Sequence, residues 1–182
     1  PAPQPYWQLA DAVAAGRAQP FSGTEAQAVS ELDATLARAV GTRMVADVPL
    51  GAFLSGGIDS SLVVALMQAR SAQPVQSFTI GFSTEDYDEA PFARAVARHL
   101  GTAHTELYVS PAASDVYKRQ DEPFADCSQI PTYLVSALAR RHVTVAMSGD
   151  AGDELFAGYT RYPVTQGLWR RQRTYEVGGD LG

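Results

Sequence analysis

The sequence predicts an α/β fold in which a parallel β-sheet is covered by helices on both faces. Short apolar runs typical of strands alternate with longer segments of helical periodicity along most of the 182 residues. Two of the predicted strands run directly into Ser-Gly loops, at Ser55–Gly57 and at Ser148–Gly149. Because ligands bind at the carboxyl ends of parallel strands, we expect both loops to face one ligand.

Helices and strands are predicted in strict alternation. Apolar residues recur every three or four positions from Val29 to Val40, which predicts a helix from Thr24 to about Met44, with Thr24 or Ser22 as its cap. A strand follows and ends at the first Ser-Gly loop. The later elements are a helix over 59–70, a strand over 75–81, a helix over 89–100 that stops at Gly101, a strand over 105–109, a helix over 130–141 and a strand over 143–147.

Residues 1–23 differ in composition from the rest of the chain. They contain four prolines and two glycines around an apolar patch at Tyr6 and Trp7. We interpret this segment as a linker that packs against another part of a protein, and residues 24–182 as the folded domain.

The stretch Ser55–Ser61 reads Ser-Gly-Gly-Ile-Asp-Ser-Ser and lies between a predicted strand and a predicted helix. Gly56 and Gly57 permit conformations that other residues avoid, and the serine hydroxyls lie beside the free N–H groups of a helix N-terminus. Such a loop suits an anion, most often phosphate, although a tight turn with capping serines fits these residues equally well. A Walker loop is excluded because the sole lysine is Lys118.

Asp59 lies inside this loop, where a carboxylate would repel phosphate unless a cation lay between them. Mg²⁺ commonly takes one or two carboxylates together with phosphate oxygens and water, and Asp153 is a candidate for the second carboxylate. The structural alternatives are a helix N-cap for Asp59 and a solvated first-turn acid for Asp153.

The loop resembles the pyrophosphate-binding loop (PP-loop) of the adenylating ATP pyrophosphatases. A second block of motifs narrows the resemblance to the synthetase domain of glutamine-hydrolysing asparagine synthetase, over about Glu25 to Tyr162. The motifs that carry it are Asp121–Asp126, Ser128–Pro131 and Ser148–Tyr159.

This resemblance implies a Rossmann-like fold of the PP-loop, adenine nucleotide alpha hydrolase-like type. It implies that residues 1–23 are a linker from an N-terminal glutaminase domain. Residues 24–182 would be the N-terminal part of the synthetase domain, with a catalytic lysine beyond Gly182.

The implied activity is ATP-dependent amide synthesis with Mg²⁺. Aspartate would be adenylated to β-aspartyl-AMP with release of pyrophosphate, and ammonia derived from glutamine would then give asparagine. Two alternatives stay open: an amidotransferase that acts on another carboxylate or closes a ring, as β-lactam synthetase does, and a non-catalytic nucleotide-binding module.

The resemblance also implies roles for individual residues. Asp150 would act in forming the acyl-adenylate; its alternative is a loop aspartate that caps the next helix. Ala151 and Ala157 stand where the family usually has glycine, so a positive φ at Ala151 would strain the loop. The implied metal ligands are Asp59 and Asp153. An acidic cluster of Asp121, Glu122 and Asp126 either lines the site or is solvated. The implied ATP-binding residues are Leu54, Ser55, Gly56, Gly57, Asp59, Ser60, Ser61, Ile80, Ser148 and Gly149.

Composition argues against several other classes of protein. A net charge of −6 disfavours a general nucleic-acid binder, and no apolar run approaches the ~20 residues that cross a membrane. The sole cysteine, Cys127, is simplest as a reduced thiol in a cytoplasmic protein. The three histidines lack the spacing of metal ligands. A homodimer stays open.

Overall fold

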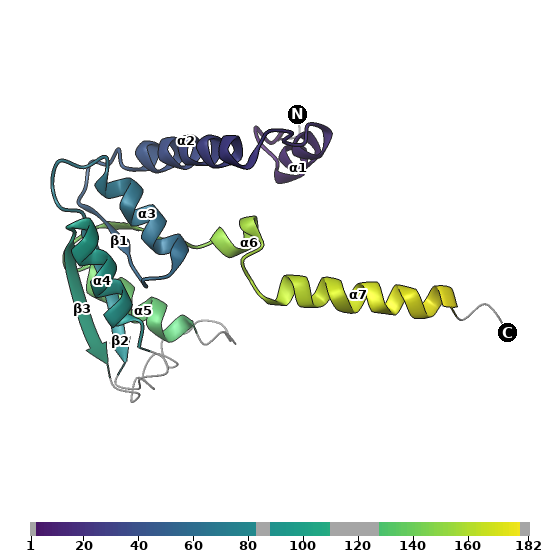
Figure 1. Cartoon of the computed structure of the whole chain (residues 1–182). Coiled ribbons are helices and arrows are strands. Elements are labelled where there is room, and N and C mark those ends of the chain that lie inside the picture. The colour runs from purple at the N-terminus through teal and green to yellow at the C-terminus, as the bar shows by residue number, and fades with distance from the viewer. Residues whose placement is uncertain (1–2, 83–87, 110–127, 179–182) are drawn as a thin grey trace. The chain divides into compact units, whose positions relative to one another are not determined.

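The computed structural model describes residues 3–82, 88–109 and 128–178 of the chain (Figure 1). It divides into two compact units, Pro1–Ala39 and Val40–Gly182. The predicted acidic cluster of Asp121, Glu122 and Asp126 lies outside the described residues.

The first unit contains helix α1 (Leu9–Ala18) and most of helix α2 (Glu25–Arg43). The N-terminus of α2 is a reciprocal cap: the Gln27 amide donates to Thr24 Oγ1 at 3.3 Å, and the Thr24 amide donates to Gln27 Oε1 at 2.8 Å. The predicted helix and its Thr24 cap are therefore confirmed. Helix α1 has no buried residue, and it adds a regular element to the segment expected to be a linker.

The second unit is built on a four-stranded sheet in the order β3-β2-β1-β4, with every neighbouring pair parallel. The predicted parallel sheet is confirmed. The two edge strands differ from the prediction by two residues each, β3 beginning earlier and β4 later. The strands are β1 (Leu50–Phe53), β2 (Gln76–Phe82), β3 (Ala103–Val109) and β4 (Val145–Met147).

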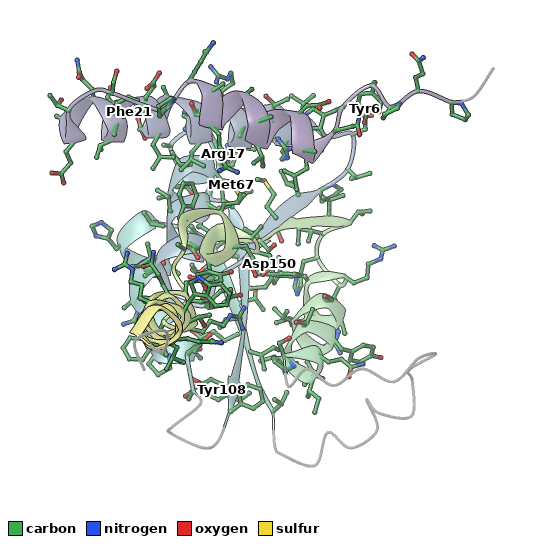
Figure 2. The ribbon with its side chains drawn as sticks, turned by 90° about the vertical axis from the view of Figure 1, so that its right-hand side faces the viewer. Tyr6, Arg17, Phe21, Met67, Tyr108 and Asp150 are labelled. Carbon is green, nitrogen blue, oxygen red and sulfur yellow. The ribbon has the colours of Figure 1, made fainter. Side chains whose placement is uncertain are left out.

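Helices cover both faces of this sheet. Figures 1 and 2 show α4 (Ala90–Leu100) on one side of the strands and α5 (Gln129–Ala139) on the other. Phe78 and Ile80 of β2 form the buried cluster on the α5 face, together with Leu138. Helix α3 (Ile58–Gln68) contacts α4. The predicted layering is therefore confirmed.

A partly buried polar network lies on the α4 face of the sheet. Ser77 Oγ lies 2.9 Å from His104 Nδ1, and Arg94 of α4 makes two hydrogen bonds to the Glu106 carboxylate, at 2.7 and 2.5 Å. Helix α4 approaches closely because it presents buried alanines to the strands, and it ends at Gly101, whose φ of 73° is left-handed. The predicted stop at Gly101 is confirmed.

Two further helices follow β4: α6 (Gly152–Phe156) and α7 (Arg161–Gly178). Residues 161–170 of α7 are all exposed. Across the described part of the chain, no helix combines the length and the apolar character needed to cross a membrane.

Candidate functional site

A cleft of about 1170 Å³ opens at the carboxyl ends of β1, β2 and β4. Its volume is slightly above the roughly 300–1,000 Å³ that is typical of small-ligand sites. The loops after β1 and β4 line it, together with the ends of the strands, the start of α5, and α6. All the predicted site residues that the structure describes line this cleft except Gly56 and Ser61, namely Leu54, Ser55, Gly57, Asp59, Ser60, Ile80, Ser148, Gly149, Asp150 and Asp153.

Hydrogen bonds within the first Ser-Gly loop hold it in shape. Ser60 Oγ accepts from the Ser55 amide at 3.2 Å and lies 2.9 Å from Ser55 Oγ, which in turn accepts from the Gly57 amide at 3.2 Å. These two hydroxyls, expected to be offered to a ligand, are engaged in the loop itself. The first backbone N–H groups of α3 have no partner within the helix, and they are the donors left for an anion.

The two adjacent glycines of this loop have different roles. Gly56 has φ of 86°, and a Cβ atom there would lie 2.7 Å from the Ala93 amide nitrogen of α4. This position therefore needs glycine both for its conformation and for packing against α4. Gly57 has an ordinary φ of −69° and is the exposed N-cap of α3. The prediction of an unusual conformation is confirmed for Gly56 and wrong for Gly57.

Ser61 does not reach the cleft. Its Oγ is buried without a hydrogen-bond partner among the described residues, and the side chain lies beside a shallow groove between α3 and α4. Each residue along a helix is rotated by about 100° from the one before it, and Ser61 is the first residue of α3 whose side chain is turned out of the cleft, toward the groove between α3 and α4.

The second Ser-Gly loop packs directly on the first. A Cβ atom on Gly149 would lie 2.6 Å from the Ser60 amide nitrogen, and one on Gly152 would lie 2.5 Å from the Asp59 carboxylate. The expectation that both loops face one site is thus confirmed. Figure 2 labels Asp150 in the second loop, well apart from Tyr108 near the carboxyl end of β3.

The Asp59 carboxylate is half-buried at this junction, and within the described part of the chain it has no hydrogen bond or ion pair. Asp153 is also half-buried and lines the same cleft. The described residues contain no group of three or more His, Cys, Asp or Glu side chains that could hold an ion. Two carboxylates with further oxygens from a phosphate and water match the ligand set of Mg²⁺, so these residues fit that ion.

Asp150 is exposed and is held by Ser148. The Ser148 hydroxyl donates to Asp150 Oδ2 at 3.0 Å, and the Asp150 amide donates to Ser148 Oγ at 3.4 Å. The N-cap of α6 is Ala151, and no side chain caps that helix end. The alternative interpretation of Asp150 as a helix cap is therefore wrong, and Asp150 lines the cleft.

Left-handed residues flank α6 at both ends. Ala151 has φ of 73° and Ala157 has φ of 57°. An L-residue with a Cβ atom pays about 1–2 kcal/mol in this region, so the expected strain at Ala151 is confirmed. Strain of this kind is typical of ligand sites and switches.

The floor of the cleft belongs to the hydrophobic core. Leu54 is 1% exposed and Ile80 is 7% exposed, so both are core residues. Both also line the cleft and make its floor apolar.

The cleft is also lined by Glu89, Glu154 and Tyr159, which the sequence did not indicate as site residues. Glu89 lies at its edge, just before α4, and partial desolvation raises the pKa of its carboxyl. The Tyr159 hydroxyl donates to Glu154 Oε1 at 2.9 Å, and this hydrogen bond is the main cause of the raised pKa of Tyr159. Glu89 follows the carboxyl end of β2, so the rule that ligands bind at strand ends could have indicated it.

The fold and the paired loops define a Rossmann-like α/β protein of the PP-loop class. The structure resembles an NH3-dependent NAD synthetase from Campylobacter jejuni, with a TM-score of 0.53 and 17% identity over 71% of this chain and 60% of that chain. It also resembles an NMN synthetase from Francisella tularensis, with a TM-score of 0.51 and 18% identity over 71% and 58% of the two chains. At these identities the likeness shows the fold alone.

Sequence comparison shows the family. The family model described as asparagine synthase matches residues 31–181, and the chain belongs to this family. The chain is 41% identical over 160 residues to a putative glutamine-hydrolysing asparagine synthetase 2 of Methanocaldococcus jannaschii, covering 85% of this chain and 30% of that protein. It is 37% identical over 150 residues to the glutamine-hydrolysing asparagine synthetase 1 of Bacillus subtilis, covering 79% of this chain and 23% of that protein. The chain thus spans less than a third of the length of these curated relatives.

Proposed function

We propose that this chain is the ATP-binding part of a glutamine-hydrolysing asparagine synthetase. The observation that carries the proposal is the contact between the two Ser-Gly loops, in which Gly149 lies against Ser60 and Gly152 lies against Asp59. This contact gathers free backbone N–H groups and two carboxylates at one end of a single cleft. Such an arrangement suits a triphosphate bound together with a divalent cation.

The proposed pose of the nucleotide follows from the polarity of the cleft. The backbone N–H groups at the start of α3 would bind the pyrophosphate portion, and Asp59 and Asp153 would hold Mg²⁺. That ion would neutralise charge on the phosphates. The adenosine portion would lie over the apolar floor formed by Leu54 and Ile80. Because the loop is already held by Ser55 and Ser60, little reorganisation would accompany binding.

The proposed reaction needs no covalent bond to the protein. An oxygen of the aspartate side-chain carboxylate attacks the α-phosphorus of ATP, and the bond from that phosphorus to the bridging oxygen breaks, releasing pyrophosphate. Ammonia then attacks the acyl carbon and displaces AMP. The chain contributes positioning and fixed N–H dipoles, and Asp150, oriented by Ser148, would act in the adenylation step.

The longer relatives suggest how the chain is used. Their names specify glutamine hydrolysis, and we infer that residues 1–23 connect residues 24–182 to a glutaminase domain that supplies ammonia in a cytoplasmic enzyme. The described residues 3–23 fit a connecting role, since their side chains are exposed and α1 buries none of its residues.

A chimeric enzyme tests the reaction. The matching segment of the Bacillus subtilis relative would be replaced by residues 31–181 of this chain, and ATP would be supplied with aspartate labelled with ¹⁸O in its carboxylates. We expect aspartate-dependent pyrophosphate release, with ¹⁸O transferred to AMP because the carboxylate oxygen stays on the phosphorus.

Three controls test the role of Asp150, the adenylation of aspartate and the identity of the carboxylic acid that accepts ammonia. Asp150→Asn in the chimera should reduce pyrophosphate release by about 10²-fold or more, as loss of one preorganised polar group at a reacting centre commonly does. Unlabelled AMP formed together with asparagine would contradict adenylation of aspartate. Release that depends on another carboxylic acid and not on aspartate would support the alternative acceptor.

A further inference from the structure

The lining of the cleft has an unbalanced charge. Among the described residues it carries five carboxylates and no Lys, Arg or His side chain. A nucleoside triphosphate adds further negative charge, and one bound divalent cation would not offset the total. Phosphate groups that bind in an acidic cleft need a guanidinium or an ammonium group close to the rim of the cleft. The carboxylates are Asp59, Glu89, Asp150, Asp153 and Glu154.

Arg161 is the cation positioned to meet this need. Its guanidinium carbon lies 3.9 Å above the centre of the Tyr159 ring, and Tyr159 forms part of the cleft wall. The distance is well inside the range of a cation–π contact, which favours the flat stacked pose. Within the described part of the chain, Arg161 has no carboxylate partner. Its donors are therefore available to a ligand.

Tyr159 is itself held in place by a hydrogen bond to Glu154. Its hydroxyl donates to Glu154 Oε1 at 2.9 Å, which ties the segment before α7 to α6. Asp153, Glu154 and Arg161 all act on the Tyr159 hydroxyl through their charges. Tyr159 thus holds Arg161 at the wall of the cleft that Asp153 also lines, and this is the cleft in which ATP is proposed to bind.

We propose that Arg161, held on the ring of Tyr159, binds the terminal phosphates of ATP and helps to stabilise the pyrophosphate that leaves. Tyr159 is a positioning residue, because it acts through Arg161. The inference rests on the proposed function, since it assumes that a triphosphate occupies the cleft. A guanidinium forms two parallel N–H···O bonds to a phosphate, and such charge-assisted bonds are the strong ones.

Titration calorimetry with Mg-ATP and with AMP tests the inference on the 182-residue chain. Arg161→Ala should weaken Mg-ATP binding by about tenfold or more, the loss expected for a charge-assisted hydrogen bond, and should change the affinity for AMP by less than about twofold. Arg140→Ala is the matched control, because it removes the same charge from the exposed C-terminal end of α5, outside the cleft. It should leave both affinities unchanged.

Variants of Tyr159 separate positioning from folding. Tyr159→Leu removes the ring and should lower the ratio of ATP to AMP affinity as Arg161→Ala does. Tyr159→Phe keeps the ring and should restore most of that ratio, although it loses the hydrogen bond to Glu154.

The outcomes distinguish this inference from the proposed function. Mg-ATP binding that needs Asp59 but is unaffected by Arg161→Ala overturns this inference alone. Equal losses of ATP and AMP affinity in Arg161→Ala also overturn it, because they would mean a general structural effect. No Mg-ATP binding by the folded parental chain would overturn the proposed function and this inference with it.

Discussion

The backbone of Gly149 lies against the backbone of Ser60 so closely that a Cβ atom on Gly149 would come within 2.6 Å of the Ser60 amide nitrogen. The contact joins the loop after β4 to the start of α3, two segments almost ninety residues apart in the sequence. Because the obstructing atom is backbone, no side-chain rearrangement can make room. The position therefore specifies glycine for reasons of space.

Gly149→Ala should lower the free energy of unfolding by about 2 kcal/mol, since overpacking typically costs about 1–3 kcal/mol. Urea denaturation followed by circular dichroism would measure the change. Gly167→Ala is the matched control, because a Cβ atom there meets no described residue within 4 Å and Gly167 lies in helix α7. If the two variants were equally stable, the close contact of the two loops would be refuted.

The alanines at the two ends of α6 have left-handed backbone conformations, so replacing them with glycine should stabilise the fold. Ala151→Gly and Ala157→Gly should each raise the free energy of unfolding by about 1 kcal/mol, because glycine adopts positive φ without the steric cost that alanine pays. Ala137→Gly, at an exposed position inside α5, should lower it by about 0.5–1 kcal/mol. The free energy of unfolding should therefore change in opposite directions at the ends of α6 and inside α5. A loss of stability in Ala151→Gly or Ala157→Gly would exclude the left-handed conformation at that residue.

The partly buried polar network around His104 predicts a pH dependence of stability. His104 Nε2 is buried and has no hydrogen bond among the described residues, and Glu106 Oε1 lies 3.6 Å from it, too far to accept one. Burial lowers the pKa of His104 below the usual 6.5, and it outweighs the opposing effect of the Glu106 charge. The unfolded chain therefore binds a proton more readily than the folded chain does.

As a result, the free energy of unfolding should fall as the pH drops from about 7.5 to about 5.5. The lowered pKa of Glu106, caused chiefly by its hydrogen bonds to Arg94, adds a further loss only below 4.5, the usual value for glutamate. His104→Gln should flatten the slope above pH 5.5, and His99→Gln, at an exposed position of α4, should not. A slope that survives in His104→Gln would assign it to another group.

Much of the second unit could be predicted because its elements carry strong local signals. The apolar spacing in α2 and α4, Gly101 at a helix end and the β-rich run of β2 each specify one structure. Helix α1 could not be predicted in this way, since it buries none of its residues and the prolines and glycines of the segment 1–23 around it are typical of a linker. The limits of β3 and β4 depend on pairing with β2 and β1, which is a property of the sheet and not of the segment.

The residues of the candidate site could be predicted from the sequence where they belong to one of the two loop motifs. Asp59, Gly149 and Asp150 lie in one cleft because two loops leave parallel strands at the same edge of the sheet. Which side chains enter the cleft could not be predicted from the motifs. Ser61 points away from the cleft, while Tyr159 enters it through contacts with Glu154 and Arg161 that only the folded chain brings together.

The central claim is that the joined loops form one site for a nucleoside triphosphate and its cation. Calorimetric titration of ATP into the chain, with and without Mg²⁺, tests it most directly when Asp59→Asn is titrated in parallel. We predict Mg²⁺-dependent binding that is at least tenfold weaker in Asp59→Asn, because that substitution removes one charged ligand of the proposed ion. Binding that is equally tight without Mg²⁺ and unchanged in Asp59→Asn, or no binding by a chain shown to be folded, would contradict the claim.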